Sequence, residues 1–512
     1  MATQSTSTTS GVTRITGTYS GLDVDALVTA GVATDQSKLD KAKQAEQIME
    51  WKQEQYRTIM TDVTNFSNKY LSSTGENSLT MSSDWNAMKA TSDNSAVTAT
   101  ASTGASTKNY TVNVNQIATA SSYTINSTNA DNSTNTDLAA GKSIYIKDSA
   151  GKDITITLSG TTKQDIAKNL NSSLTSAGVK VSATYSDFAN NGKGGVVLES
   201  QVLGTGSKFN VTLAGTNHDS DVTDGKNLNA TIIDGSNTYT INDSSTNNKS
   251  NSITLDNVTF NFKAKTTTGA TVSTTKDTST VADKLTSFVD DYNTLLKEIN
   301  GKIYETYDKN YAPLTDAQKK AMTDTQITQW NTKAQTGLLR KDEYLTSLAS
   351  DMKDAMTTMM SGSGFNLEKL GITPVDDYGS LNGTYKVTDK SKLTSALENN
   401  FDKVYQLFTT STSTDLTKSM STDGLLAKLK VGFYNNVTAS SSKMAKKAGV
   451  DGYSTSLNNE MTKAMTDQQT LIDTLEDKLN DKETALYNKY STLETKLSSL
   501  ESSSSALSSF SS

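Results

Sequence analysis

Three zones with different hydrophobic periods follow one another along the chain. In the first zone, apolar residues recur in steps of three and four, with one polar exception. The stripe comprises Ala42, Ala45, Met49, Lys52, Tyr56, Ile59, Val63, Phe66 and Tyr70. This narrow spacing is typical of a coiled-coil seam. We therefore predict a long stalk helix over residues 41–77, preceded by a disordered or extended leg segment over residues 1–40.

The middle zone changes to a period of two. The alternating apolar positions are Tyr110, Val112 and Val114, then Ile154, Ile156 and Leu158, then Phe209, Val211 and Leu213, and finally Val258, Phe260 and Phe262. Such alternation is typical of antiparallel strands with one polar face. The pattern predicts a first β domain from residues 78–125 and 250–277, with a second β domain inserted at 126–249. One helix interrupts the strands, with Thr161 and Gln164 spaced as its capping box.

The last zone returns to helical periodicity. A stalk domain is predicted over residues 278–455, where Phe288 and Tyr292 belong to a further stripe with steps of three and four. Over residues 456–512, apolar residues recur every seven positions. These are Ile472, Leu479, Leu486, Leu493, Leu500 and Leu507. A repeat of seven predicts a coiled-coil leg helix at the C-terminal end.

The order of the zones predicts an α+β multidomain fold. A coiled-coil stalk and leg would be formed by both chain ends, and antiparallel β head domains would be inserted between them. The alternative is three unrelated domains on a string. The candidate protein-binding residues lie along the leg and the coiled-coil seam. They are Leu22, Leu27, Tyr56, Ile59, Val63, Phe66, Ile472, Leu479, Leu486, Leu493, Leu500 and Leu507.

The composition argues against catalysis. With no Cys and a single His, the chain has no disulfide, no thiolate ligand and no multi-His metal site. Asp219–Gly225 suggests a calcium loop, but Asp224 and Ala230 occupy the positions that require Gly and Glu, so a polar turn is favoured. We predict no catalytic residue, no cofactor and no metal.

Charge and hydropathy exclude two classes of partner. The 48 Lys and Arg against 55 Asp and Glu give a net charge of -7, which provides no general attraction to nucleic acid. No apolar run approaches the roughly 20 residues of a membrane helix, so no membrane insertion is expected. We expect no Sec signal peptide, because residues 1–10 are rich in Ser and Thr and show no basic stretch followed by an apolar one.

Six short motifs are dispersed in order along the chain. They are SGLDVD at 20–25, EWKQEQYR at 50–57, FVDDYN at 288–293, YAPLTD at 311–316, GLLRKD at 337–342 and LYNKYSTLE at 486–494. Together they resemble the bacterial flagellar filament cap family, also called the hook-associated protein 2 family. The last motif departs from the family pattern, which more often has Phe and Met where this chain has Tyr490 and Leu493.

The resemblance implies a structural role at the tip of the flagellum. Cap proteins are exported by the flagellar secretion apparatus and form a homo-oligomeric ring at the distal end of the extracellular filament. Their terminal segments contact the filament, and flagellin folds and inserts beneath their head domains. The implied partners are other copies of the chain, flagellin, hook-associated junction proteins and a cytoplasmic export chaperone, with host mucin as a further one.

Two other functions are compatible with the same pattern. A surface adhesin would bind mucin or matrix through the β head, and this activity could coexist with capping. Another rod-type component of the hook–filament junction would also carry helical termini around β insertions.

Overall fold

The computed structural model describes residues 6–9, 12–15, 17, 19–126, 138–241, 248–358, 364–375, 379–450 and 452–510. They form two compact units, which we call the helical unit (residues 1–84 and 282–512) and the β unit (residues 85–281). Helices from both ends of the chain thus enclose a run of antiparallel sheets in the sequence, which confirms the predicted α+β class.

The helical unit contains two long helices, α1 (Val24–Tyr70) and α13 (Glu460–Phe510), and many shorter elements. The other helices are α5 (Thr278–Tyr304), α6 (Asp316–Lys320), α7 (Asp324–Gln335), α8 (Glu343–Met356), α9 (Lys390–Asn399), α10 (Phe401–Thr409), α11 (Leu425–Phe433) and α12 (Lys443–Ala448). Single turns are η2 (Leu367–Leu370), η3 (Gly379–Leu381), the π-helical η4 (Tyr434–Thr438) and η5 (Ser454–Ser456). Two hairpins complete it, β1 (Thr6–Thr9) with β2 (Val12–Ile15) and β18 (Ile372–Pro374) with β19 (Tyr385–Val387).

The helix α1 begins 17 residues earlier than the sequence pattern predicts, so residues 1–40 do not form one disordered or extended segment. Asp23 caps the helix, because its Oδ1 accepts the backbone N–H of Ala26 at 2.9 Å. The stretch after it carries buried Val28, Val32 and Leu39, which cover α13. Tertiary packing on α13 thus extends α1 through a stretch that has weak helical propensity.

The second half of α1 lies in the core of the helical unit, where Tyr56, Ile59, Val63 and Phe66 are buried. Phe66 contacts three aromatic rings, those of Tyr70, Phe288 of α5 and Phe433 of α11, with centroids 5.0–5.8 Å away. These contacts join residues before and after the β insertion. The alternative of unrelated domains on a string is therefore wrong.

Three positions of the predicted seam in α1 are only half-buried, namely Ala45, Met49 and Lys52. Lys52 is half-buried, whereas its neighbours Trp51 and Gln53 are buried. The Gln53 amide donates to the carbonyl of Ala448 at 3.1 Å and to Asn459 Oδ1 at 3.2 Å. Because these hydrogen bonds satisfy the amide, a polar side chain can occupy a core position here.

The β unit contains two cores. The first β domain has a five-stranded sheet in the order β14-β13-β5-β17-β3 and a three-stranded sheet in the order β15-β16-β4. Its strands are β3 (Met88–Ser92), β4 (Val97–Ala101), β5 (Asn109–Gln116), β13 (Asn229–Asp234), β14 (Asn237–Ile241), β15 (Ser252–Leu255), β16 (Val258–Phe262) and β17 (Ala270–Lys276). Tyr110, Val112 and Val114 are buried on alternate positions of β5, as the period of two requires. A short helix, α2 (Ser82–Trp85), precedes this domain in the chain.

The inserted β domain has sheets in the orders β6-β10-β9 and β12-β11-β7-β8. Its elements are β6 (Ala120–Asn126), β7 (Ser143–Lys147), β8 (Asp153–Thr157), α3 (Lys163–Ala177), β9 (Val181–Ser186), α4 (Ala189–Gly192), β10 (Gly195–Leu203), β11 (Asn210–Leu213) and β12 (Thr216–Asn217). Ile166, Leu170 and Leu174 of α3 are buried in its core. The capping box of α3 is formed by Thr162 and Asp165, one residue beyond the predicted pair Thr161 and Gln164.

The predicted boundaries between the two β domains are wrong at both ends of the insertion. Strand β6 lies before residue 126 but pairs with β10 of the inserted domain, with Ile125 opposite Val196. Strands β13 and β14 lie within 126–249 but extend the sheet of the first domain, with Ile232 opposite Val112. Pairing between strands far apart in the sequence decides domain membership, and a local period cannot report it.

Candidate functional site

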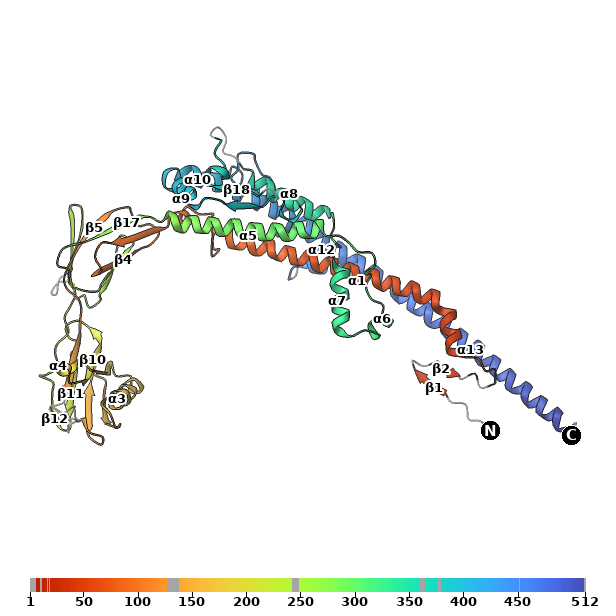
Figure 1. Ribbon diagram of the computed structural model, residues 1–512, viewed down its shortest axis with the longest axis horizontal. Helices are drawn as coiled ribbons and strands as arrows, with labels where there is room; N and C mark the ends of the chain where they lie inside the picture. The colour runs from red at the N-terminus through yellow and green to blue at the C-terminus, as the bar shows by residue number, and fades with distance from the viewer. Residues whose placement is uncertain are drawn as a thin grey trace. The chain divides into compact units, whose positions relative to one another are not determined.

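The two ends of the chain meet along the helices α1 and α13, which run antiparallel and lie side by side in Figure 1. Val32, Leu39 and Ala42 of α1 are buried against Ile472 and Leu479 of α13. Each fully buried Leu or Ile contributes about 1.5–3 kcal/mol. The helix pair therefore holds together residues that lie more than 400 positions apart in the chain.

A second cluster lies where α1 begins. Val24 and Val28 pack on Tyr487, whose hydroxyl donates to Asp25 Oδ1 at 2.7 Å. One turn further along α1, Gly31 leaves room for Leu486, because a Cβ at position 31 would lie 2.7 Å from Leu486 Cδ1. A side chain at position 31 would therefore require the end of the Leu486 side chain to shift.

Charged pairs flank the apolar stripe. Lys482 of α13 lies 2.6 Å from Asp35 of α1, and Lys43 of α1 lies 2.7 Å from Glu476 of α13. Exposed pairs of this kind contribute about 0–1 kcal/mol each. They select the register and direction of the helix pair more than they stabilise it.

A tight turn at residues 19–23 leads into α1. Gly21 has a φ of +65° and donates its N–H to the carbonyl of Gly17 at 2.9 Å. A Cβ at Gly17 would lie 2.1 Å from the carbonyl oxygen of Leu22, so a side chain cannot be accommodated there. The motif SGLDVD thus places a turn, a helix cap and the first apolar residues of α1 in fixed order.

Glu494 of α13 anchors this turn. Its side chain is 2% exposed and accepts the backbone N–H of Tyr19 at 2.9 Å and of Ser20 at 3.2 Å. Burial alone would raise the pKa of this carboxyl, but the hydrogen bonds from Ser20 and Tyr19 outweigh it and hold the pKa below its usual value. The anchor therefore depends on the ionised form of Glu494.

We expect acid to release the turn from α13. A carboxyl with a lowered pKa stabilises the contact above the ordinary Glu value of about 4.3, and this stabilisation is lost as the pH falls through the lower pKa of the folded form. Glu494→Gln should accelerate amide hydrogen exchange of Tyr19 and Ser20 at pH 7 by about tenfold, since one charged hydrogen-bond acceptor is lost. Exchange corrected for its intrinsic rate should then no longer change between pH 6 and 3.

The matched control is Glu501→Gln, on the same helix and exposed to solvent. It should leave the exchange of Tyr19 and Ser20 as in the parent chain. Equal protection in the Glu494→Gln variant and the parent would contradict the proposed anchor.

The helix α13 continues beyond its contact with α1. Leu493, Leu500 and Leu507 are 39%, 65% and 75% exposed. Leu497 lies between the first two and is half-buried. We call Leu493, Leu497, Leu500 and Leu507 the distal stripe. It prolongs the seam that α1 covers further back along α13.

The structure divides the twelve candidate residues into two environments. Eight are buried or half-buried, namely Leu27, Tyr56, Ile59, Val63, Phe66, Ile472, Leu479 and Leu486. Four are exposed, namely Leu22, Leu493, Leu500 and Leu507. The first group packs largely within the chain, and the second group presents more apolar surface to solvent. A binding role for the second group stays a prediction.

Sequence reasoning missed the residues that join the two ends, among them Val24, Val28, Tyr487 and Glu494. The steps of four from Val24 to Val32 are a helical signal that could have located the start of α1. Nothing local distinguishes Glu494 from a solvated acidic residue, because its partners are backbone N–H groups 475 and 474 positions away.

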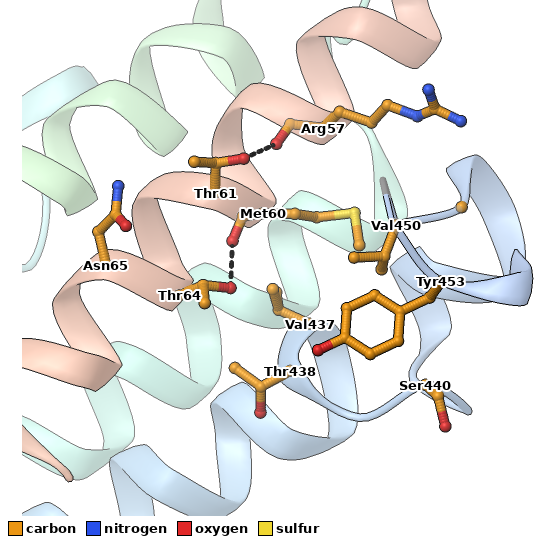
Figure 2. Close-up of a pocket in the computed structure, with 11 residues that line it drawn as sticks. Arg57, Met60, Thr61, Thr64, Asn65, Val437, Thr438, Ser440, Val450 and Tyr453 are labelled. Carbon is orange, nitrogen blue, oxygen red and sulfur yellow. Dashed lines mark hydrogen bonds between the residues drawn. The ribbon is translucent and has the colours of Figure 1, made fainter. Parts of the chain in front are cut away.

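A pocket of about 260 Å³ lies between α1, η4 and the segments that follow η4 and α12 (Figure 2). Met60, Val437, Val450 and Tyr453 provide its apolar lining. Arg57 is held by backbone carbonyls, since its Nε donates to Ala448 and its Nη2 to Ser456, both at 3.1 Å. Its polar lining is made of amide, guanidinium and hydroxyl groups, and no Asp, Glu or His is among the described residues that line it.

Two further features are absent from the described residues. They contain no group of three or more His, Cys, Asp or Glu side chains that could hold a metal ion. None of the helices within the described ranges combines the length and the apolar character needed to cross a membrane.

Comparison with known families gives two matches. The profile of the flagellar hook-associated protein 2 C-terminus matches residues 236–502. The profile of the flagellar hook-associated protein 2 N-terminus matches residues 20–121. The first match alone covers more than half of the chain, and both helices of the terminal pair lie largely within matched residues.

Individual relatives agree with these matches. A flagellar hook-associated protein 2 from Halalkalibacterium halodurans is 27% identical over 443 residues, which cover 79% of this chain and 80% of the relative. Another, from Thermotoga maritima, is 26% identical over 161 residues, which cover 31% of this chain and 24% of the relative.

Among solved structures, the D1-D2-D3 domains of the flagellar cap protein FliD from Escherichia coli align with 77% of this chain and 98% of that chain, at a TM-score of 0.42 and 20% identity. FliD from Pseudomonas aeruginosa aligns with 40% of this chain and 96% of that chain, at a TM-score of 0.27 and 23% identity.

Proposed function

Because this chain belongs to the flagellar hook-associated protein 2 family, we propose that it caps the distal end of the bacterial flagellar filament as a ring of identical chains. Flagellin subunits fold and insert beneath this ring. The terminal helix pair of α1 and α13 is the leg of the cap, and its exposed end contacts neighbouring subunits. The protein acts by assembly and does not catalyse a reaction.

The strongest support for this proposal is the contact between the two ends of the chain. The family's first and last motifs, at 20–25 and 486–494, contact each other through Tyr487, Asp25 and Glu494. Together they form one terminal structure with exposed apolar residues at its end. Exposed leucines on a helix are costly in a solitary chain and are typical of an interaction surface.

The partners follow from this role. They are other copies of the chain, flagellin, the hook-associated junction proteins, and an export chaperone that protects the exposed stripe before secretion. The chain reaches the flagellum tip through the flagellar secretion apparatus. With no Cys, it contains no crosslink that would block threading of an unfolded chain through a narrow channel.

Adhesion through the β unit is a second proposed function, and one observation favours it. Phe188, between β9 and β10 of the inserted β domain, is 91% exposed. Asn190 and Asn191 beside it both have φ of 55°. A large aromatic side chain on a tight turn is suited to stacking on a sugar ring or packing into a partner's pocket.

We expect Phe188→Ser to reduce binding of the full chain to immobilised mucin by about fivefold, since one aromatic contact contributes about 0.5–1.5 kcal/mol. Capping should be unchanged, because the leg is intact. The control is Leu457→Ser, which replaces an 85% exposed residue of the helical unit. Equal mucin binding by the Phe188→Ser variant and the control would reject adhesion through this turn.

A further inference from the structure

The distal stripe has the arrangement of a coiled-coil seam. Taking Leu493 as position d of a heptad, Leu500 and Leu507 are also d positions, and Leu497 and Ser504 are a positions. The same numbering makes Ile472, Leu479 and Leu486 d positions, and these are the residues of α13 that face α1. The distal stripe is therefore a continuation of an established interface.

The flanking charges indicate which partner fits. In this numbering Lys496 is a g position and Glu501 is the e position of the next heptad. Both side chains are exposed. In a parallel coiled coil, a g residue lies beside the e residue five positions later on the other helix. Lys496 of one copy would thus pair with Glu501 of a second copy.

The antiparallel arrangement is disfavoured by the same residues. There, g positions face g positions and e positions face e positions, which would oppose Lys496 to Lys496 and Glu501 to Glu501. Like charges at such distances are destabilising. The pattern of charges therefore selects a second copy in parallel orientation.

We propose that the distal stripe binds the same stripe of a second copy, so that the C-terminal ends of two α13 helices form a short parallel coiled coil. This inference rests on the proposed ring only in one respect, that rotational symmetry points all C-terminal ends the same way. It names the occupant of a surface that the helix α1 leaves uncovered.

The distal stripe is short, so we expect two stripes to pair stably only when other contacts already hold the copies together. From Leu493 to Leu507 the stripe spans two heptads, and isolated helices of that length are marginal in water. Here the helix is already formed, because it continues from the part of α13 that packs on α1. Contacts elsewhere in an assembly raise the effective concentration of the stripes.

Single cysteines test the inference, because the chain has none of its own. Leu500→Cys and Leu507→Cys chains should form disulfide-linked dimers about tenfold faster than Leu471→Cys, since pairing raises the effective concentration of the thiols. Leu471 is 47% exposed on the same helix but lies off the stripe, at a c position. Rates equal to that of Leu471→Cys would overturn the inference.

Orientation is tested by mixing two variants. In a parallel pair, Leu493→Cys links to itself and Leu507→Cys links to itself. A mixture in which the Leu493→Cys to Leu507→Cys product dominates would show antiparallel pairing and overturn the inference. Cross-linking that requires added flagellin would do the same, because flagellin would then be the occupant.

Charge reversal gives an independent readout. Lys496→Glu places two acidic residues together and should weaken self-association of the full chain about threefold, measured by sedimentation. The double variant Lys496→Glu with Glu501→Lys should restore it. The control Lys478→Glu makes the same change at an exposed c position and should have no effect. Failure of the double variant to restore association would reject the pairing.

The outcomes separate this inference from the proposed function. If the parent chain caps filaments but the stripe cysteines do not link, the cap role stands and the self-pairing is wrong. If the cysteines link but the parent chain does not cap filaments, the self-pairing stands and the cap role is wrong.

Discussion

Removing residues 1–40 and 473–512 is expected to abolish filament capping while both units stay folded. The deletion removes the turn at 19–23 and the part of the α1–α13 contact that includes Leu39 and Leu479, and it leaves Ala42 and Ile472 in the chain. It leaves Tyr56 to Phe66 and their partners on α5 and α11 in place. Capping is measured as flagellin incorporation at filament ends, and folding as far-ultraviolet circular dichroism and cooperative thermal melting.

The control for this deletion is Phe188→Ser in the full chain, which removes an exposed apolar residue of the β unit and should cap normally. Flagellin incorporation by the truncated chain at the level of the control would reject the terminal pair as the leg of the cap. Loss of cooperative melting in the truncated chain would show that the termini are needed for folding as well.

Phe66→Ala is expected to destabilise the helical unit by about 3–5 kcal/mol, which is typical of a large aromatic residue removed from a packed core. Phe66 contacts Tyr70, Phe288 and Phe433, and Phe288 in turn contacts Phe408, so the cavity would lie at the centre of an aromatic cluster. The measurement is the denaturant midpoint of the transition that carries the helical circular dichroism signal.

The comparison variant is Leu457→Ala, in the same unit and 85% exposed. Exposed substitutions of this kind stay within about 0.5 kcal/mol of the parent. The assignment of Phe66 to the core would fail if both variants unfolded at the same denaturant concentration.

Local periodicity was sufficient for the elements whose burial pattern lies within one helix or strand. The steps of three and four in α1 identified Tyr56, Ile59, Val63 and Phe66 as inward-facing, and the alternation in β5 did the same for Tyr110 and Val112. Which of these residues face inward depends only on the repeat of a single helix or strand that buries one face. They do not depend on knowing which segment provides the other face.

The sequence pattern did not show which distant segments pair with each other. Gly31 interrupts the helical pattern of α1, and in the structure it lies against the side chain of Leu486 on the other terminal helix. Strand β13 belongs with β5 although more than a hundred residues separate them. Contacts between distant segments determine where helices begin and where domains end. These contacts cannot be predicted from a short window of residues.

In the candidate site, too, the sequence alone could not predict which residues are buried. The repeat of seven predicted the apolar stripe of α13 correctly, but the part of the stripe that is covered depends on where α1 begins. Since that start is set by Asp23 and by packing on Tyr487, the distinction between buried Leu479 and exposed Leu500 required the structure.

The contact of Tyr19 with Glu494 spans 475 positions of the chain. As an open loop, a chain of this length would carry a large entropic cost of closure, which grows with the logarithm of loop size. The folded β unit removes 197 residues from the flexible path, since it spans 85–281. The terminal pair therefore closes across a shortened tether, so the folded β unit lowers the entropic cost of joining the two chain ends.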